Sequence, residues 1–323
     1  MDRTPASPGN LLCNGAFLPE LWTRVNSRDA IPVPCPVTAQ TFAADRWHVR
    51  YAAPQGGAVA QVRSTERPPE CSVGSSLEIQ GGEGVAQPVY VGQNVEADER
   101  LPHELRFRAW CHVEHPHLQG GAVRLVIGSP VQRDLFDSSV ECVAQREAFL
   151  APHAWTLLDF TFDTTGLRPS GLRVELELPP GLLDHSAARV RLADVSLHQP
   201  SAPEASRRSL ADESAIASRF FQRHDAQLRN AIGRALVCNR HELHFQFTFP
   251  LMRAFPSISL PQDNEDFCVH SLDGLQQSGF VYDVPFRTRG SAIIRATKRN
   301  HQLCDGYLAF RGYRGAILLD SEL

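Results

Sequence analysis

Trp110 lies in a segment, from Leu105 to Val113, where apolar and polar residues alternate. Successive side chains of a β-strand point to opposite faces, so Trp110 shares a face with the polar even-numbered residues. An indole ring can stack on the C–H side of a sugar ring, and neighbouring guanidinium and carboxylate groups can bind the sugar hydroxyls. The chemistry expected of this face is therefore carbohydrate recognition. Its polar members are Arg106, Arg108, His112 and Glu114.

Trp155 begins a second alternating segment, which runs to Asp163. Its apolar even-numbered residues form the buried side, which leaves Trp155 and Asp159 on the polar side. A third segment, 172–178, alternates in the same way and places Arg173 and Glu175 on a polar face. The candidate carbohydrate-binding residues are Trp110, Arg106, Arg108, Asp159, Trp155, Arg173 and Glu175.

The same alternation has a plainer interpretation. The tryptophans could cover the edge of a β-sandwich while the charges form a solvated face. Parity alone favours this plainer interpretation over a sugar site.

Glu175 and Glu177 form a carboxylate pair that could act in catalysis. By strand rise these residues stand about 7 Å apart on one face, a separation that an inverting glycosidase can use. Alternate charges are, however, the default on an exposed strand, and the chain has no G-x-S-x-G elbow. We assign no catalytic residue and expect a non-enzymatic protein.

The histidines of segment 112–117 resemble metal ligands only superficially. Strand geometry sends His112 and His115 to opposite faces, and Pro116 ends the strand, so chelation would be strained. His241 and His244 lack the spacing of the H-E-x-x-H zinc motif. We therefore expect no metal site and no cofactor.

The segments that carry these residues belong to a long β-rich region. From Phe42 to Leu197 the chain alternates between strand-like segments and clusters of Gly, Pro and Asp. No helical periodicity lies between these segments. This pattern predicts an all-β sandwich.

A segment rich in proline and serine, 199–208, divides the chain of 323 residues. A capping box at 209–212 and apolar residues at helical spacing then predict a helix. Strand alternation returns at Leu243. We predict a β-sandwich over 1–198, a linker and helix over 199–232, and a small β-domain over 233–323 that oligomerises. The apolar residues of the helix are Ile216, Ala217, Phe220, Phe221 and Leu228.

Composition limits the partners. The net charge of −4 and the lack of long like-charged runs predict no nucleic-acid partner. No apolar stretch is long enough to span a bilayer, and the N-terminus lacks the apolar core of a secretory signal, so we expect cytoplasmic synthesis and no membrane insertion. The eight cysteines are widely spaced without a C-x-x-C pair, which favours small core residues over a zinc or redox site.

Several short motifs occur in order along almost the whole chain. They are NLLCNGAF at 10–17, ADRW at 44–47, SLEI at 76–79, LADVSL at 192–197, RFFQR at 219–223, FPLMRAFPSI at 249–258 and LDSEL at 319–323. Their order and spacing resemble phage tail-fibre and head-spike proteins, including the head spikes of phage-like gene transfer agents. One departure is that the predicted helix has Ser218 and phenylalanines where that family commonly has Cys and Tyr.

The resemblance implies a jelly roll of the galactose-binding or carbohydrate-binding-module type in the first part, a linker helix, and an oligomeric, often trimeric, C-terminal β-domain. It implies a protein of the bacteriophage virion surface that binds host cell-surface or capsular polysaccharide to promote attachment. Its other partners would be further virion proteins and copies of itself. The resemblance leaves open a structural calcium ion in the jelly roll.

Two other functions stay open at this point. The chain could be a structural connector of the virion that binds no sugar. It could also be a glycan depolymerase or esterase, although no catalytic residues have been assigned.

Overall fold

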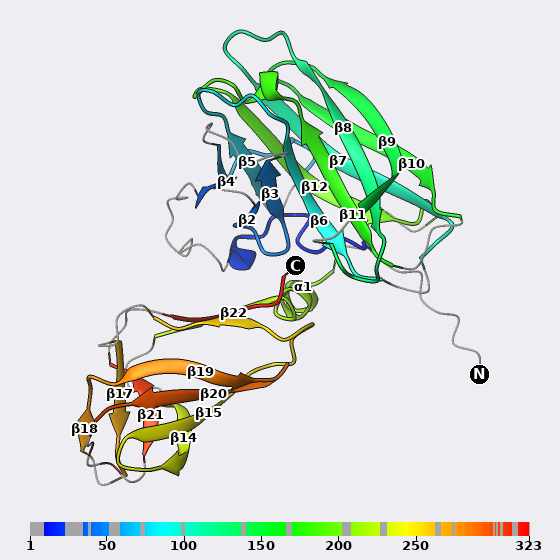
Figure 1. Cartoon of the computed structure of the whole chain (residues 1–323). Helices are drawn as coiled ribbons and strands as arrows, with labels where there is room; N and C mark the ends of the chain where they lie inside the picture. The colour runs from blue at the N-terminus through cyan, green and yellow to red at the C-terminus, as the bar shows by residue number, and fades with distance from the viewer. Residues whose placement is uncertain are drawn as a thin grey trace, which may run out of the picture. The chain divides into compact units, whose positions relative to one another are not determined.

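A computed structural model describes most of the chain, which divides into two compact units (Figure 1). The first unit runs from Met1 to Ala217 and the second from Ser218 to Glu322. Within the linker predicted at 199–208, residues 202–207 lie outside the described residues. The described residues are 10–22, 35–37, 40–51, 59–71, 75–97, 101–136, 140–165, 170–201, 208–226, 231–261, 266–272, 275–299, 301, 303, 306–311 and 316–322.

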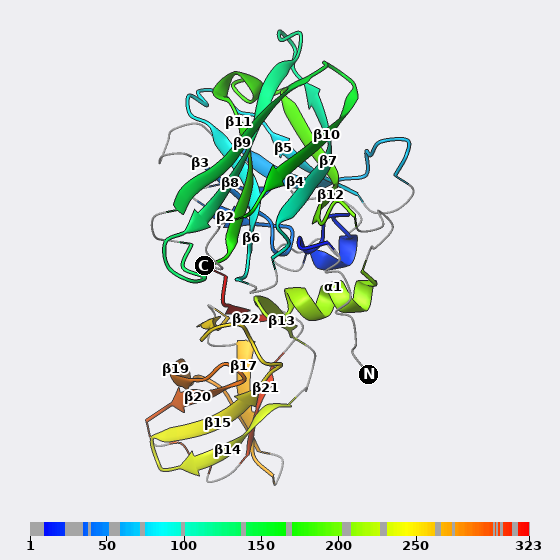
Figure 2. The same cartoon turned by 90° about the vertical axis from the view of Figure 1, so that its right-hand side faces the viewer.

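The first unit is an antiparallel jelly roll in which two six-stranded sheets pack face to face (Figure 2). Sheet A has the order β1 (Cys35–Pro36), β4 (Ala60–Ser64), β5 (Ser76–Gln80), β12 (Arg189–His198), β7 (Glu104–Glu114), β10 (Trp155–Asp163). Sheet B has the order β2 (Gln40–Phe42), β3 (His48–Tyr51), β6 (Val89–Val95), β11 (Leu172–Leu178), β8 (Gly121–Pro130), β9 (Val140–Leu150). Two short 3-10 helices, η1 (Pro19–Leu21) and η2 (Pro180–Leu182), lie in the connections.

Alternation along the strands fills the space between the two sheets with apolar side chains. In β7 the odd-numbered residues Leu105, Phe107 and Ala109 are buried in this core, whereas Arg106 and Arg108 are partly exposed on the other side. Burying one such leucine or phenylalanine stabilises the fold by about 1.5–3 kcal/mol. The predicted all-β sandwich and the predicted parity of β7 are confirmed.

The second unit is also built of strands, arranged in two antiparallel sheets around a core rich in phenylalanine. Its three-stranded sheet has the order β13 (Phe221–Asp225), β22 (Ala316–Asp320), β16 (Ser257–Ser259). Its seven-stranded sheet has the order β18 (Gln276–Gln277), β17 (Phe267–His270), β21 (Tyr307–Phe310), β14 (Ala231–Cys238), β15 (Glu242–Thr248), β20 (Ser291–Thr297), β19 (Val281–Arg287).

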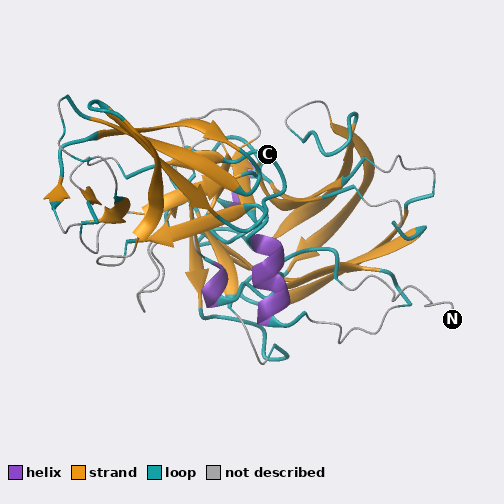
Figure 3. Cartoon of the chain, turned by 90° about the horizontal axis from the view of Figure 1, so that it is seen from below, coloured by secondary structure: helices purple, strands orange, loops and turns teal. Residues whose placement is uncertain are grey.

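Strands dominate the described chain, and its one described α-helix, α1 (Leu210–Ala217), is shorter than the sequence predicts (Figure 3). The capping interaction is present, because the backbone N–H of Asp212 donates to Ser209 Oγ at 3.2 Å. The predicted extension through Phe221 is wrong. Phe221 begins β13 and pairs with Asp320 of β22, so sheet pairing overrides the helical spacing of these apolar residues. Leu228 lies outside the described residues.

No helix in the described part of the chain is long and apolar enough to cross a membrane. The cysteines that can be placed carry free thiols, and most of them are core residues, as predicted. Cys13, Cys71, Cys111 and Cys268 are buried, Cys35 is half-buried and Cys142 is exposed.

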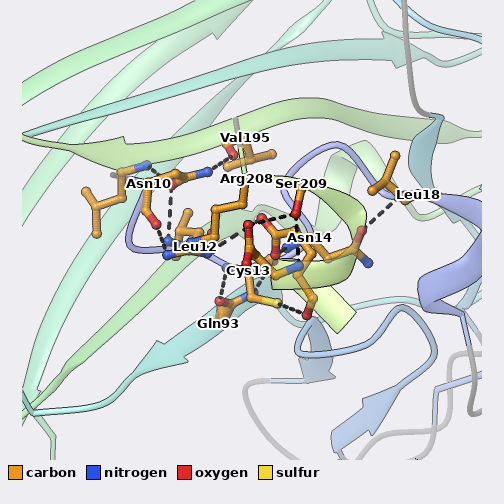
Figure 4. Close-up of polar contacts among 12 residues, drawn as sticks. Asn10, Leu12, Cys13, Asn14, Leu18, Gln93, Val195, Arg208 and Ser209 are labelled. Carbon is orange, nitrogen blue, oxygen red and sulfur yellow. Dashed lines mark hydrogen bonds and ion pairs between the residues drawn. The ribbon is translucent and has the colours of Figure 1, made fainter. Parts of the chain in front are cut away.

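The N-terminal segment NLLCNGAF forms a clamp that holds strands β12 and β6 (Figure 4). Asn10 holds the segment to β12, since its Oδ1 accepts from the backbone N–H of Leu197 at 2.8 Å and its Nδ2 donates to the Val195 carbonyl at 3.2 Å. Cys13 is joined to β6 in both directions, because its backbone N–H donates to Gln93 Oε1 at 2.7 Å and its carbonyl accepts from Gln93 Nε2 at 2.9 Å. These side chains therefore serve the fold.

The same clamp holds helix α1 through Glu213, which is only 7% exposed. Its Oε2 accepts a hydrogen bond from the backbone N–H of Asn14 at 2.8 Å, and its Oε1 lies 3.6 Å from Arg208 Nη1. Arg208 in turn donates to the Leu12 carbonyl at 3.1 Å. The helix is thus fastened to the jelly roll by a buried carboxylate.

Glu213→Ala is expected to lower the free energy of unfolding of the first unit by about 1–3 kcal/mol, because it leaves a buried backbone N–H without its acceptor. All four tryptophans of the chain, Trp22, Trp47, Trp110 and Trp155, lie in this unit, so urea unfolding of the whole protein followed by tryptophan fluorescence reports on it. Asp212→Ala, which removes an exposed carboxylate of the same helix, is the control and should cost less. Equal unfolding midpoints for the two variants would contradict the role of Glu213.

Candidate functional site

In sheet A, strand β7 lies between β12 and β10 (Figure 2). It carries Trp110 on the outer face of the sheet. The neighbours of Trp110 across the sheet are Ala193 of β12 and Leu157 of β10. Ala193 contributes only a methyl group, which cannot cover an indole ring. The ring is accordingly only partly buried.

Trp155 lies beside Trp110 on the same face. It pairs with His112, two residues further along β7, so the two tryptophans are diagonal neighbours, a relation in which residues lie about 7–8 Å apart. The ring of Trp155 contacts the ring of His112, with 5.2 Å between the centroids and 45° between the planes. The structure thus brings both predicted tryptophans together in one aromatic platform, defined here as Trp110 and Trp155.

The hydrogen bonding of the indole N–H groups distinguishes the two platform tryptophans from the buried tryptophans. Trp47 Nε1 donates to the Cys13 carbonyl at 3.0 Å, and Trp22 Nε1 donates to the Phe17 carbonyl at 3.4 Å. No described residue accepts a hydrogen bond from the indole N–H of Trp110 or Trp155. Both platform residues therefore keep a donor for a ligand.

A first charged cluster lies on the Arg108 side of the platform. Arg106 holds Asp159 with two hydrogen bonds, from Nε at 2.7 Å and from Nη2 at 2.5 Å. Arg108 lies 3.6 Å from the same carboxylate. The hydrogen bond from Arg106, followed by the charges of both arginines, lowers the pKa of Asp159. The structure therefore places Arg106, Arg108 and Asp159 on the same face as Trp110.

A second charged cluster, which the sequence analysis missed, lies on the His112 side. Arg191 of β12 bonds Glu78 of β5 through Nε at 2.6 Å and Glu114 of β7 through Nη1 at 2.8 Å. Its Nη1 also lies 3.3 Å from His112 Nδ1. The alternation of Arg189, Val190 and Arg191 could have revealed this cluster, but only with the strand order known, because its members come from three strands.

Burial and the charge of Arg191 determine the protonation states of Glu114 and His112 in this second cluster. The hydrogen bond from Arg191 lowers the pKa of Glu114, and burial, followed by the charge of Arg191, lowers the pKa of His112. At neutral pH the carboxylate is therefore ionised and the imidazole neutral. Glu114 remains 34% exposed, which leaves carboxylate lone pairs for a ligand hydroxyl.

Arg173 and Glu175 do not belong to this face, so the predicted seven-residue set is wrong as a single site. Both lie on the outer face of sheet B, with the sandwich core between them and the platform. Arg173 is engaged within the fold, donating to the Phe136 carbonyl and to Asn94 Oδ1. Alternation tells on which side of its own sheet a residue lies, but not which sheet its strand joins.

Glu175 is almost fully buried on sheet B and serves an internal ion pair. Its Oε1 accepts from Arg50 Nε at 2.7 Å and lies 2.9 Å from His48 Nε2, and its Oε2 accepts from Arg50 Nη2 at 2.6 Å. Gly92 stands between His48 and Glu175 in the sheet register, and a Cβ there would lie 2.6 Å from Glu175 Cγ. The glycine therefore gives the glutamate the room to meet both partners.

The carboxylate pair of β11 is poorly suited to glycoside hydrolysis. Burial alone would raise the pKa of Glu175, but hydrogen bonds from His48 and Arg50 outweigh it and bring the pKa to about 2. Glu177 is paired with Arg124. Hydrolysis needs one carboxyl group that holds its proton near neutral pH, and Glu175, with its low pKa, cannot supply it.

The histidines that resembled metal ligands are used in other ways. His112 lies on the outer face of sheet A, and His115 follows the end of β7 and contacts Asp184. Among the residues that the structure describes, no group of three His, Cys, Asp or Glu side chains could hold a metal ion.

Comparisons with known proteins give no family assignment. No protein-family model matches the chain, and no curated protein matches it. An arabinose-bound α-L-arabinofuranosidase structure has 12% identity over 68% of this chain, with a TM-score of 0.37. A tailspike protein 4 domain of Bacteriophage CBA120 has 7% identity over 47%, with a TM-score of 0.33. This chain spans 34% of the first and 19% of the second.

A family 11 carbohydrate-binding module from Clostridium thermocellum, solved with a mixed-linked tetrasaccharide, is 10% identical over 50% of this chain and 96% of its own, with a TM-score of 0.32. All three likenesses are weak in identity and in superposition. They assign no ligand and no activity to this chain.

Proposed function

We propose that the first unit binds carbohydrate, without catalysis, on the outer face of sheet A. The observation that carries this proposal is the aromatic platform, in which Trp110 and Trp155 are diagonal neighbours on one face with no described acceptor for either indole N–H. A solvated sandwich face has no need of two adjacent tryptophans, because exposed indole area is costly in water.

The platform and its flanks offer what a sugar requires. The C–H side of a sugar ring would stack on an indole, while Asp159 on one side and Glu114 on the other would accept hydrogen bonds from ring hydroxyls. Arg106 and Arg191 hold these two carboxylates in place. A preorganised acceptor loses little side-chain entropy when a ligand binds.

For the biological setting, we propose a virion surface protein, in a fibre or head spike, that attaches to host cell-surface or capsular polysaccharide. The ordered motifs of both units support this setting through their resemblance to phage fibre and spike proteins. Other virion proteins and copies of the chain would be its partners, and the expected self-assembly is a trimer. Exposed apolar residues of the second unit, Val281 and Phe286 on the edge strand β19, suit an oligomer contact.

The sugar site is tested by binding of the whole protein to a glycan array and to host capsule, for wild type, Trp110→Ala and Trp155→Ala. Each substitution should weaken binding by about 1–3 kcal/mol, or roughly 5- to 150-fold in Kd, through the loss of one stacked ring. The control is Phe149→Ala, which removes an aromatic ring that is 65% exposed on β9 of sheet B.

Affinity that Trp110→Ala and Trp155→Ala leave unchanged would remove the platform from the site. Binding to no glycan or capsule would favour the structural connector instead. New reducing ends or released acetate after incubation with capsule would indicate an enzyme.

A further inference from the structure

Histidines gather at one end of the jelly roll, where the β7–β8 turn meets the β11–β12 turn. The rings of His115 and His117 from the first turn and His185 from the second contact one another, with centroids 5.4–6.1 Å apart. His112 and His153 lie close by: His112 Nδ1 is 3.9 Å from Glu114 Oε1, and the His153 backbone N–H donates to the Val113 carbonyl at 2.9 Å. Five of the 13 histidines of the chain thus share this end.

His115 holds the β7–β8 turn together through a ring nitrogen that must be unprotonated. Its Nδ1 accepts hydrogen bonds from the backbone N–H of His117 at 3.1 Å and of Leu118 at 3.0 Å. With Nδ1 as acceptor, the ring proton sits on Nε2, which lies 2.9 Å from Asp184 Oδ1. An imidazolium has no lone pair at Nδ1, so protonation removes both backbone hydrogen bonds at once.

His185 stabilises the β11–β12 turn in the same way, through an unprotonated ring nitrogen. Its Nδ1 accepts from the backbone N–H of Ala187 at 2.9 Å. Protonation of this ring would remove that bond as well. Both turns are therefore stabilised by neutral histidines whose rings touch, and protonation would also place like charges in contact.

The charged groups around the three rings do not replace the Nδ1 acceptors that protonation removes. Asp184, which already bonds His115, is the one carboxylate in hydrogen-bond contact with a described ring of the cluster, and it is 51% exposed. Glu83 accepts from the Ser186 backbone N–H at 3.4 Å, and Glu114 lies before the first turn. On the opposing side, Arg189 Nη1 donates to the Ser186 carbonyl at 2.6 Å and adds positive charge.

We propose that this end of the jelly roll is an acid-sensitive element, in which protonation of His115 and His185 releases the β7–β8 and β11–β12 turns together. Because the first turn follows Glu114 and the second precedes Arg189, acidification loosens the end of sheet A that carries the second charged cluster. The inference does not depend on sugar binding.

The acid-sensitive element is tested by hydrogen exchange of the whole protein at pH 7.5 and pH 5.0. Exchange times are scaled to the intrinsic exchange rate at each pH. The reporters are peptides that contain the amides of His117, Leu118 and Ala187. In the wild type their protection should fall about tenfold or more at pH 5.0, because their acceptors are lost. Peptides from the central strands should keep their protection, and tryptophan fluorescence should stay unchanged.

The matched variant is the double substitution His115→Asn with His185→Asn. The asparagine Oδ1 takes the place of the histidine Nδ1 and accepts from the same backbone N–H groups, but it does not titrate. This variant should keep its protection at pH 5.0, while His115→Phe with His185→Phe should lack it at both pH values. Equal wild-type protection at the two pH values, or an equal loss in the asparagine variant, would overturn the proposal.

Discussion

Glu175→Gln is expected to lower the free energy of unfolding of the jelly roll by about 3–5 kcal/mol at neutral pH. The substitution keeps the shape of the side chain but removes the charge that compensates a partly buried guanidinium, Arg50, and that orients His48. Removing one member of a buried ion pair is costly because the partner charge stays behind. Glu175 is 3% exposed, so water cannot replace what is lost.

Glu177→Gln is the control for this measurement. Glu177 lies two residues away on the same strand face, but its partner Arg124 is 43% exposed and can be solvated when the pair is broken. The expected loss is below about 1 kcal/mol. Urea unfolding of both full-length variants, followed by tryptophan fluorescence, compares them directly. Similar urea midpoints for the two variants would show that the burial of Glu175 contributes little to the free energy of unfolding.

The same residue makes the jelly roll sensitive to strong acid. In the folded protein the pKa of Glu175 is about 2, against an ordinary value of 4.5. A pKa depressed by folding stabilises the native state above pH 4.5, and this contribution, about 3 kcal/mol, is lost as the pH falls from 4.5 towards 2. The stability gap between the wild type and Glu175→Gln should therefore narrow over this range. A constant gap would contradict the assignment.

Strand parity was a reliable guide to which side of its own sheet a side chain takes. It placed Trp110, Arg106 and Arg108 on the outer side of β7, and Trp155 and Asp159 on the outer side of β10, because a strand with one buried face must alternate. The pairing of β7 with β10 then brought the two groups together. This much of the candidate site could be predicted from single strands.

Sheet membership could not be predicted in this way. Arg173 and Glu175 have the same pattern as the residues of β7, yet β11 pairs with β6 and β8 in sheet B. The Arg191 cluster was missed for the same reason, since its residues come together only through the order β5, β12, β7. Both outcomes depend on pairings between strands far apart in sequence, which local alternation does not contain.

For the helix, the local pattern predicts more than the structure contains. The apolar spacing predicts a helix through Phe221, but α1 ends at Ala217. Phe220 and Phe221 continue the apolar spacing of α1, but they are buried where the chain meets the final strand, and the Phe220 carbonyl accepts from the Ser321 backbone N–H at 2.7 Å. Strand pairing supplies this segment with backbone partners and apolar contacts that a longer helix would have to match. Tertiary packing therefore decides the end of the helix.

Gly15→Ala is the second substitution expected to have a large effect. β12 has a bulge after Ala193, with Asp194 at a φ of 49°, and there the Val195 backbone N–H donates to the Gly15 carbonyl at 2.8 Å. A Cβ on residue 15 would lie 1.9 Å from the Val195 carbonyl oxygen, far inside van der Waals contact with backbone that the bulge holds in place.

The backbone must separate to admit this methyl group, and the clamp formed by Asn10, Cys13 and Asn14 separates with it. We therefore expect a loss of about 3–5 kcal/mol, at the upper end of single substitutions. Gly181→Ala is the control, because a Cβ there meets nothing within 4 Å, and it should be neutral or slightly stabilising. Thermal unfolding followed by tryptophan fluorescence measures both. A Gly15→Ala protein as stable as Gly181→Ala would show that the N-terminal segment can leave β12 at little cost, and that the motif NLLCNGAF is not needed to hold the jelly roll together.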